Sequence, residues 1–131
     1  MDVTARLRNH ACLAVPSYRK DIPMGKIRIW GRKSSVNVQL VLWTLDELNL
    51  AYQRVDAGFI YGVVDTEAFK EMNPNGRVPV LSDGDGQPIF ESASILRYLA
   101  NRYGDDVFWP KRMAARAQID KWAEWAKWNF G

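Results

Sequence analysis

The sequence has very few residues that bind soft metals or form covalent cross-links. Among its 131 residues there is one cysteine, Cys12, and one histidine, His10. A single cysteine excludes an internal disulfide and a Cys-X-X-Cys redox pair, and a lone thiol is typical of a reducing compartment such as the cytoplasm. Because these two side chains are too few for a zinc site, we expect no metal cofactor.

Long apolar runs are also lacking. No run approaches the ~20 residues that a helix needs to cross a bilayer, and 47% apolar with 25% charged residues is typical of a soluble globular protein. The net charge of +3 arises at the two ends of the chain, since residues 26–110 carry nine basic and eleven acidic side chains. A nucleic-acid groove concentrates basic residues on the folded body. We therefore expect neither a membrane nor a nucleic-acid partner.

The chain divides into four segments. Residues 1–25 show neither alternation nor a sustained helical period and are predicted to be a flexible extension, although three arginines leave a mitochondrial-type presequence as an alternative. Residues 26–104 contain alternating strand and helix patterns and form the predicted α/β domain. Residues 105–110 are a predicted linker, and residues 111–131 are expected to be the first helix of a truncated all-α domain.

The α/β domain opens with a β-α-β pattern. Apolar and polar residues alternate over Lys26–Trp30, which predicts a strand. Apolar residues then recur at helical spacing over about 37–49, and Leu50–Val55 is a second predicted strand. A unit of this length is typical of two parallel strands joined by a crossover helix.

Turn residues separate the elements that follow. Asp65 or Thr66 is a suitable cap for a short helix that reaches Met72. Residues 78–82 and 88–90 are predicted strands, and the Asp-Gly-Asp-Gly sequence between them indicates a hairpin. We expect Ser92 to cap the next helix and Gly104 to end it in the left-handed conformation. The predicted order is β-α-β-α-β-β-α, which favours a small mixed sheet flanked by helices.

The last predicted helix, residues 111–129, carries an unusual amount of aromatic surface. Trp122, Trp125 and Trp128 lie within two turns, and each ring can bury about 150 to 250 Å². We expect another helical domain or another subunit to cover this face.

Pro79 stands out because it follows Val78 in what otherwise resembles a buried strand. Proline in a central strand removes a hydrogen bond of the ladder, so this backbone is expected to present main-chain groups to a ligand. The Val78–Pro79 bond is also a candidate for a cis peptide, a form that X-Pro bonds reach at modest cost.

Two motifs around Pro79 resemble a known family. The sequences N-P-N-G-R-V-P-V-L and F-E-S-A-S-I-L-R-Y-L resemble the N-terminal domain of glutathione S-transferases, which has a thioredoxin-like fold. The resemblance covers about residues 26–104 and continues weakly into A-R-A-Q-I-D-K-W in the last helix. The remaining helices of the family are absent from this sequence.

The resemblance implies a site for glutathione, an extended anionic tripeptide. It implies that the Val78 main chain pairs with the cysteinyl part, as in strand addition, and that Pro79 is structural. Glu91 and Ser92 would hold the γ-glutamyl end at a helix N-terminus, and Arg77 would supply a polar contact. The alternatives are a simple helix cap at Ser92, solvated charges at Glu91 and Arg77, and a proline that merely shapes a turn.

The resemblance also places a thiolate-stabilising group before the first helix. Alignment with the family puts Ser35 where serine-type enzymes keep a catalytic hydroxyl, with Ser34 as a competitor and Asn37 as a possible amide donor. A hydrogen bond to the thiolate lowers the pKa of the thiol. The alternative, that these residues only cap the helix, is about equally good on sequence alone. No tyrosine or cysteine lies in this loop, which disfavours tyrosine-type and cysteine-type mechanisms.

The implied function is that of a serine-type glutathione S-transferase, theta-like or of a related bacterial class. Glutathione would act as co-substrate, and its thiolate would attack a small electrophile. The family builds the electrophile pocket largely from C-terminal helices, so we expect weak glutathione binding, low or absent turnover and homodimer formation. The alternatives are a non-catalytic interaction module with the same fold and, because Asn37 stands where many relatives have proline, a glutathione-dependent disulfide reductase.

Overall fold

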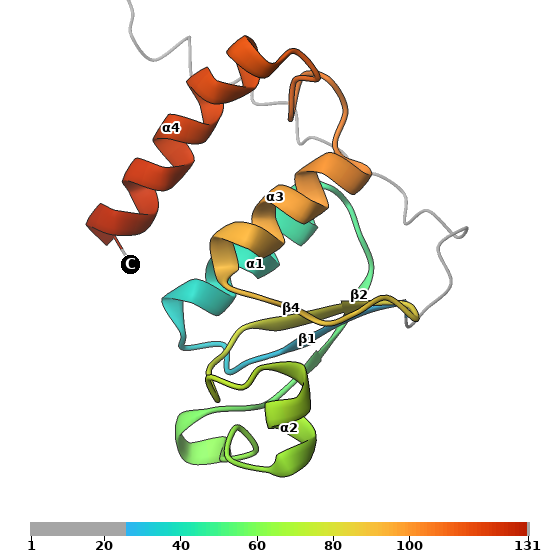
Figure 1. The fold of residues 1–131 in the computed structure, drawn as a ribbon, viewed down its shortest axis with the longest axis vertical. Coiled ribbons are helices and arrows are strands. Elements are labelled where there is room, and N and C mark those ends of the chain that lie inside the picture. The colour runs from blue at the N-terminus through green and yellow to red at the C-terminus, as the bar shows by residue number, and fades with distance from the viewer. Residues whose placement is uncertain (1–25, 131) are drawn as a thin grey trace, which may run out of the picture.

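A four-stranded mixed sheet forms the centre of the computed structural model, which describes residues 26–130 (Figure 1). The strands are β1 (Ile27–Trp30), β2 (Tyr52–Val55), β3 (Val80–Asp83) and β4 (Ile89–Phe90). They lie in the order β2-β1-β3-β4, with β1 parallel to β2 and antiparallel to β3, and with β4 antiparallel to β3. The β-α-β unit and the hairpin are therefore both present, and the thioredoxin-like α/β fold is confirmed.

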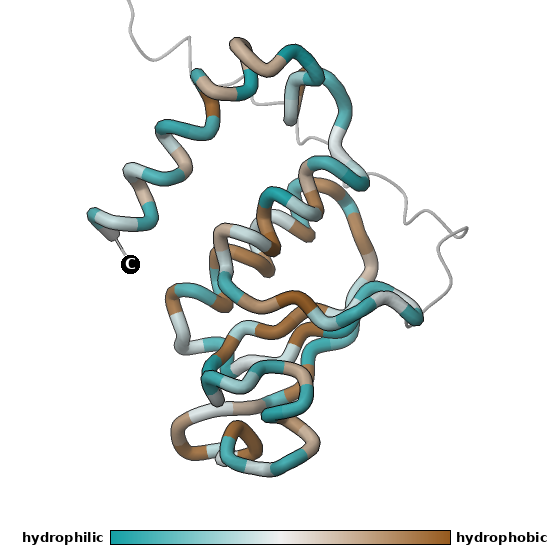
Figure 2. The backbone as a smooth tube through the Cα atoms, in the orientation of Figure 1, coloured by the Kyte–Doolittle hydropathy of each residue, from teal (hydrophilic) through white to brown (hydrophobic). Residues whose placement is uncertain are grey.

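Two helices cover one face of this sheet. Helices α1 (Val36–Glu47) and α3 (Ser92–Tyr103) lie side by side on it (Figure 1). The apolar side chains at helical spacing face inward and bury the alternate residues of the central strands. The members of this core are Ile27, Ile29, Val38, Val41, Leu45, Leu81, Ile95 and Leu99. Figure 2 shows the same concentration of hydrophobic residues in the sheet and in these two helices.

The other face carries a short helix and a loop. Helix α2 (Glu67–Met72) follows the 3-10 turn η2 (Phe59–Tyr61), and both lie beyond the sheet from α1 (Figure 1). Phe69 of α2 packs on Val80, the strand residue that points away from the first core. The Thr66 hydroxyl accepts a hydrogen bond from the Phe69 N–H at 3.3 Å, so Thr66 is the cap of α2.

Three local predictions can be compared with the backbone. The Val78–Pro79 peptide is cis, as expected. Ser92 is the first residue of α3 rather than its cap, because Glu91 occupies the N-cap position. The prediction for Gly104 was wrong as well, since its φ is −74°. Glycine fits there for another reason: a Cβ would lie 2.5 Å from the carbonyl oxygen of Ala100.

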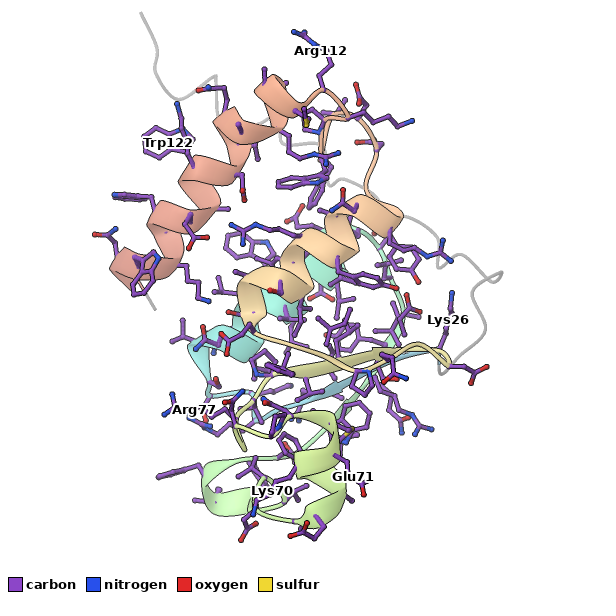
Figure 3. The ribbon with its side chains drawn as sticks, in the orientation of Figure 1. Lys26, Lys70, Glu71, Arg77, Arg112 and Trp122 are labelled. Atoms are coloured by element: carbon purple, nitrogen blue, oxygen red, sulfur yellow. The ribbon has the colours of Figure 1, made fainter. Side chains whose placement is uncertain are left out.

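The last helix, α4 (Met113–Phe130), packs on α3. Arg97 of α3 donates to Asp120 at 2.8 Å and to Glu124 at 2.6 Å. Trp122 projects from the side of α4 that is turned away from α3 (Figure 3) and is 62% exposed. All three tryptophans of α4 are at least half exposed in the described part of the chain.

Residues 1–25, including Cys12 and His10, lie outside the described part of the chain. Within residues 26–130, no helix is both long enough and apolar enough to cross a membrane. The same range contains no group of three or more acidic, histidine or cysteine side chains that could hold a metal ion.

Candidate functional site

Ser35 is the N-cap of α1, and its hydroxyl has no partner among the described residues. Its carbonyl accepts the first helical hydrogen bond from the Gln39 N–H at 2.9 Å, while the side chain makes no capping bond. The residue is only 8% exposed, whereas its neighbour Ser34 is exposed. Because a helix N-terminus favours negative charge, the Ser35 hydroxyl is the better placed of the two serines to donate to an anionic sulfur.

The N-termini of α1 and α3 are joined by one side-chain hydrogen bond. The Ser92 hydroxyl donates to Oδ1 of Asn37 at 3.1 Å, and Ser92 is buried. The first N–H groups of a helix have no intrahelical acceptor, so this bond brings two sets of unpaired donors close together. Such a place suits an anionic ligand with two separated negative groups. Asn37 acts here as an acceptor for Ser92, a role that sequence reasoning did not foresee.

Glu91 has an unusual backbone conformation. Its φ of 70° and ψ of 116° lie outside the regions that residues with a side chain prefer, and such a conformation costs about 1–3 kcal/mol. Strain of this kind is concentrated at ligand sites and active sites. The Glu91 carboxylate is exposed and lies 3.6 Å from Nζ of Lys127. The geometry thus presents a carboxylate directly before the N-terminus of α3.

The loop before β3 is held from inside by Asn73. This buried side chain donates to the Arg77 carbonyl at 2.8 Å and accepts from the Asn75 N–H at 3.0 Å. In the described part of the chain, the Val78 main chain makes no backbone hydrogen bond, so it is free to pair with an extended ligand. Arg77 is exposed (Figure 3). A buried asparagine needs hydrogen-bond partners, and here Asn73 finds them in the backbone of its own loop.

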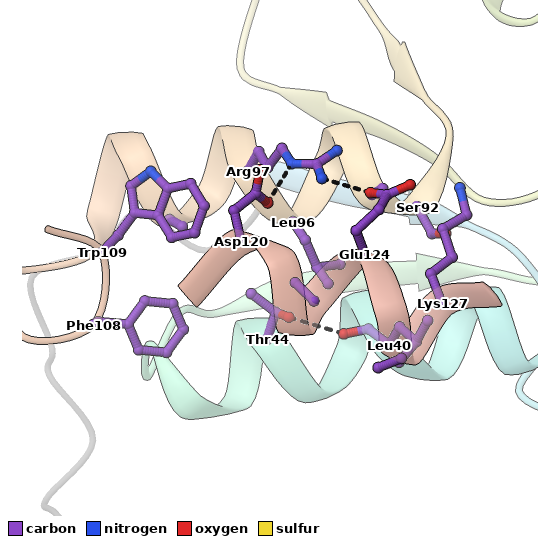
Figure 4. A pocket seen from close by; sticks show the side chains of 14 residues that line it. Leu40, Thr44, Ser92, Leu96, Arg97, Phe108, Trp109, Asp120, Glu124 and Lys127 are labelled. Carbon is purple, nitrogen blue, oxygen red and sulfur yellow. Dashed lines mark hydrogen bonds and ion pairs between the residues drawn. The ribbon is translucent and has the colours of Figure 1, made fainter. Parts of the chain in front are cut away.

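A cavity of about 220 Å³ lies between α1, α3 and α4 (Figure 4). Leu40, Leu96 and Phe108 supply part of its apolar lining, and the Arg97 ion pairs lie along it. Ser92 and Lys127 also line this cavity, so it adjoins the N-terminus of α3. Lys127 comes from α4, as do Asp120 and Glu124, and it was not predicted as a site residue. Its spacing from Asp120 and Glu124 along one helix side is the signal that sequence reasoning missed.

The most strongly hydrogen-bonded carboxylate lies elsewhere, at the end of β3. Oδ2 of Asp83 accepts from the Tyr98 hydroxyl at 2.7 Å and from the Tyr103 hydroxyl at 2.6 Å, and Oδ1 lies 3.5 Å from Nζ of Lys26. Burial raises the pKa of Asp83, but the two hydroxyls and the lysine charge outweigh it, so the pKa of this carboxyl lies below its ordinary 3.8. Burial first, and then the bond to Asp83, raise the pKa of both tyrosines to about 12. This cluster is structural, because it joins β3 to α3 at the end of the strand opposite Pro79.

The sheet order and the cis proline before β3 are those of a thioredoxin-like domain, and the N-termini of α1 and α3 meet at one edge of it. A sequence profile described as "Glutathione S-transferase, N-terminal domain" matches residues 30–106. The chain therefore belongs to the glutathione S-transferase family, and the resemblance noted from its motifs is confirmed.

Individual relatives agree with this assignment. The chain is 46% identical over 101 residues to glutathione S-transferase GstB of Escherichia coli K12, covering 76% of the chain and 49% of GstB. It is 32% identical over 120 residues to the disulfide-bond oxidoreductase YghU of the same organism, covering 84% of the chain and 41% of YghU. The chain thus spans about half the length of GstB and 41% of the length of YghU.

A solved structure shows the same fold with a ligand. The theta class glutathione S-transferase of Xanthomonas axonopodis pv. citri, crystallised with glutathione bound, superposes with a TM-score of 0.74 at 41% identity. The match covers 82% of this chain and 51% of that one. At 41% identity, this similarity agrees with the family assignment.

Proposed function

We propose that this chain binds glutathione at the edge formed by the loop before β3 and the N-termini of α1 and α3, and that it stabilises the thiolate there. One observation carries the proposal: Ser35 lies at a helix N-terminus, is only 8% exposed, and its hydroxyl makes no hydrogen bond within the described residues. A hydroxyl in this position can donate to a ligand anion without breaking an existing bond. Ser35 is accordingly the proposed catalytic residue, with Ser34 as the less favoured candidate.

Each part of glutathione has a proposed partner. The cysteinyl main chain would pair with the free Val78 backbone beside Pro79. The γ-glutamyl carboxylate would bind the first-turn N–H groups of α3 at Ser92, and its ammonium would face Glu91. Arg77 is exposed next to Val78 and would supply a polar contact to the ligand.

The reaction proposed is attack of the bound thiolate on a small electrophile, with loss of a leaving group or addition to a double bond. Because the chain spans about half the length of its relatives, we expect weak glutathione binding and low or absent turnover for the 131-residue chain. A cytoplasmic location and a homodimer belong to the same proposal. Robust turnover of a standard aryl halide by the monomeric chain would contradict the expected low activity.

The thiolate role is tested by Ser35→Ala, with Ser34→Ala as the matched control. The pKa of bound glutathione is read from the ultraviolet absorbance of the thiolate during a pH titration. We expect Ser35→Ala to raise this pKa by about one to two units, because one hydrogen bond to a charged group is lost, and Ser34→Ala to leave it unchanged. An identical pKa in wild type and Ser35→Ala would instead favour a non-catalytic module.

A second candidate activity is glutathione-dependent disulfide reduction. It is favoured by the relative named as a disulfide-bond oxidoreductase and by Asn37, whose side chain occupies the α1 terminus. Parallel assays with a disulfide and an aryl halide would distinguish the two, since a transferase acts on the halide.

A further inference from the structure

Lys127 brings a positive charge from α4 to the proposed glutathione edge. Its Nζ lies 3.6 Å from Oε2 of Glu91, and its side chain is 27% exposed while that of Glu91 is 60% exposed. The more buried partner is thus the lysine. A charge that is partly removed from water interacts more strongly with a nearby ligand than a fully solvated one.

The position of Lys127 is fixed by neighbouring contacts. Arg97 holds Asp120 and Glu124, the residues two turns and one turn before Lys127 on the same side of α4 (Figure 4). Glu124 also accepts from Nε1 of Trp128 at 3.0 Å, which orients its carboxylate. The two ion pairs of Arg97 therefore hold α4 against α3 close to Lys127. The Lys127 side chain lines the cavity together with Ser92.

This arrangement creates an electrostatic requirement for the ligand. A ligand that carries only an ammonium would have to displace Lys127 from Glu91 or share the Glu91 carboxylate with it. An α-amino-acid end carries an ammonium and a carboxylate on one carbon, so it can place the first against Glu91 and the second against Lys127. One ion pair in the free protein is then replaced by two in the complex, and the like charges stay apart.

We propose that Lys127 binds the α-carboxylate of the γ-glutamyl end of glutathione and makes the site selective for a zwitterionic terminus. The inference rests on the proposed glutathione-binding function and assigns the site a residue from α4. Lys127 has no proposed part in the reaction of the glutathione thiolate. The rival arrangement is that the N–H groups of α3 hold this carboxylate alone, in which case Lys127 contributes nothing to affinity.

Calorimetric titration of the full chain tests the proposal with three ligands. They are glutathione, 4-aminobutyryl-cysteinylglycine, which lacks the α-carboxylate, and glutaryl-cysteinylglycine, which lacks the ammonium. Lys127→Met is compared with wild type, with Lys127→Arg as the charge-preserving variant. Lys121→Met is the matched control, because Lys121 lies on the same helix, is exposed and pairs with Gln118.

We expect Lys127→Met to raise the dissociation constants of glutathione and of the glutaryl analogue about tenfold, the effect of losing one charge-assisted contact. The affinity for the 4-aminobutyryl analogue should stay the same or rise, since Glu91 is freed. Lys127→Arg should keep most of the affinity for glutathione, and Lys121→Met should behave as wild type.

The possible failures can be told apart. Wild type that binds no glutathione overturns the proposed function and this inference with it. Wild type that binds glutathione while Lys127→Met binds it equally well overturns the inference alone. An equal loss for all three ligands also overturns it, because a merely structural role of Lys127 would not depend on the ligand's carboxylate.

Discussion

At the scale of single residues, Glu91 combines a strained backbone with an exposed carboxylate. The strain follows from its φ of 70°, and the carboxylate faces solvent and Lys127. Glu91 itself is exposed and lies outside both apolar cores. The arrangement is expected where a ligand contact is kept at the expense of stability.

Substituting Glu91 separates strain from ligand binding. Glu91→Gly and Glu91→Ala both remove the carboxylate, but only glycine adopts the backbone conformation freely. We expect Glu91→Gly to have a free energy of unfolding about 1 kcal/mol higher than Glu91→Ala, after allowing for the greater entropy of unfolded glycine. Urea denaturation measures this difference.

The same two variants should lose glutathione affinity to the same extent. Equal stability of Glu91→Gly and Glu91→Ala would show that the backbone at Glu91 is not strained. Unequal affinities would show that the conformation, and not only the carboxylate, matters for the ligand.

At the scale of elements, the Asp83 cluster connects β3 to α3. The depressed pKa of Asp83 makes its contribution depend on pH. Because the folded-state pKa is lower than the unfolded value of about 3.9, this contribution is complete above that value and is lost as pH falls through the folded pKa. The contribution of the Asp83 carboxylate should therefore weaken in acid.

Asp83→Asn tests this dependence, with Asp85→Asn in the exposed hairpin turn as the control. At pH 7 we expect Asp83→Asn to lower the free energy of unfolding by about 2 kcal/mol, since hydrogen bonds to a charged group are weakened. The difference from wild type should shrink as pH falls below 4 and through the folded-state pKa of Asp83, because the wild-type carboxylate then becomes protonated. A difference that stays constant over this range would mean that the ionised carboxylate is not what stabilises the cluster.

The order of the elements could be predicted because it depends on local patterns. Alternation over β1 and helical spacing over α1 and α3 reflect which side chains enter the two cores, and the residues of these cores are spread along those patterns. The candidate site residues followed from motifs, and their positions at helix ends agree with the order of elements. Their roles in binding stay predictions.

What could not be predicted depends on contacts between distant parts of the chain. Gly104 has an ordinary φ and is required by the close approach of the Ala100 carbonyl, which no turn propensity reveals. Asp83 looked like a turn residue until α3 placed two hydroxyls beside it. Lys127 meets Glu91 only because α4 folds back on α3.

At the scale of the whole molecule, the tryptophan face of α4 bears on assembly. Trp122 and Trp125 form an edge-to-face pair with ring centroids 5.9 Å apart, and Trp122 remains 62% exposed. A large aromatic surface in water favours association. We accordingly expect this face to lie within the proposed homodimer.

Sedimentation velocity over a range of concentrations tests this expectation. Trp122→Gln should raise the dimer dissociation constant about tenfold, as loss of a central aromatic contact does. Trp43→Gln is the control, because Trp43 is 66% exposed but lies on α1. A monomer at tens of micromolar, or an equal effect of both variants, would contradict a dimer through α4.

The ion pairs of Arg97 with Asp120 and Glu124 influence every ligand affinity measured on this chain. The three side chains are all at least 36% exposed, and contacts between such groups are individually weak. If α4 opens and closes, only molecules with α4 closed have Lys127 at the binding edge, and the observed dissociation constant is the intrinsic one divided by the closed fraction. Salt screens these ion pairs and would then weaken glutathione binding in two ways. It would screen the charged contacts between protein and ligand, and it would lower the fraction of molecules in which Lys127 is in place to bind.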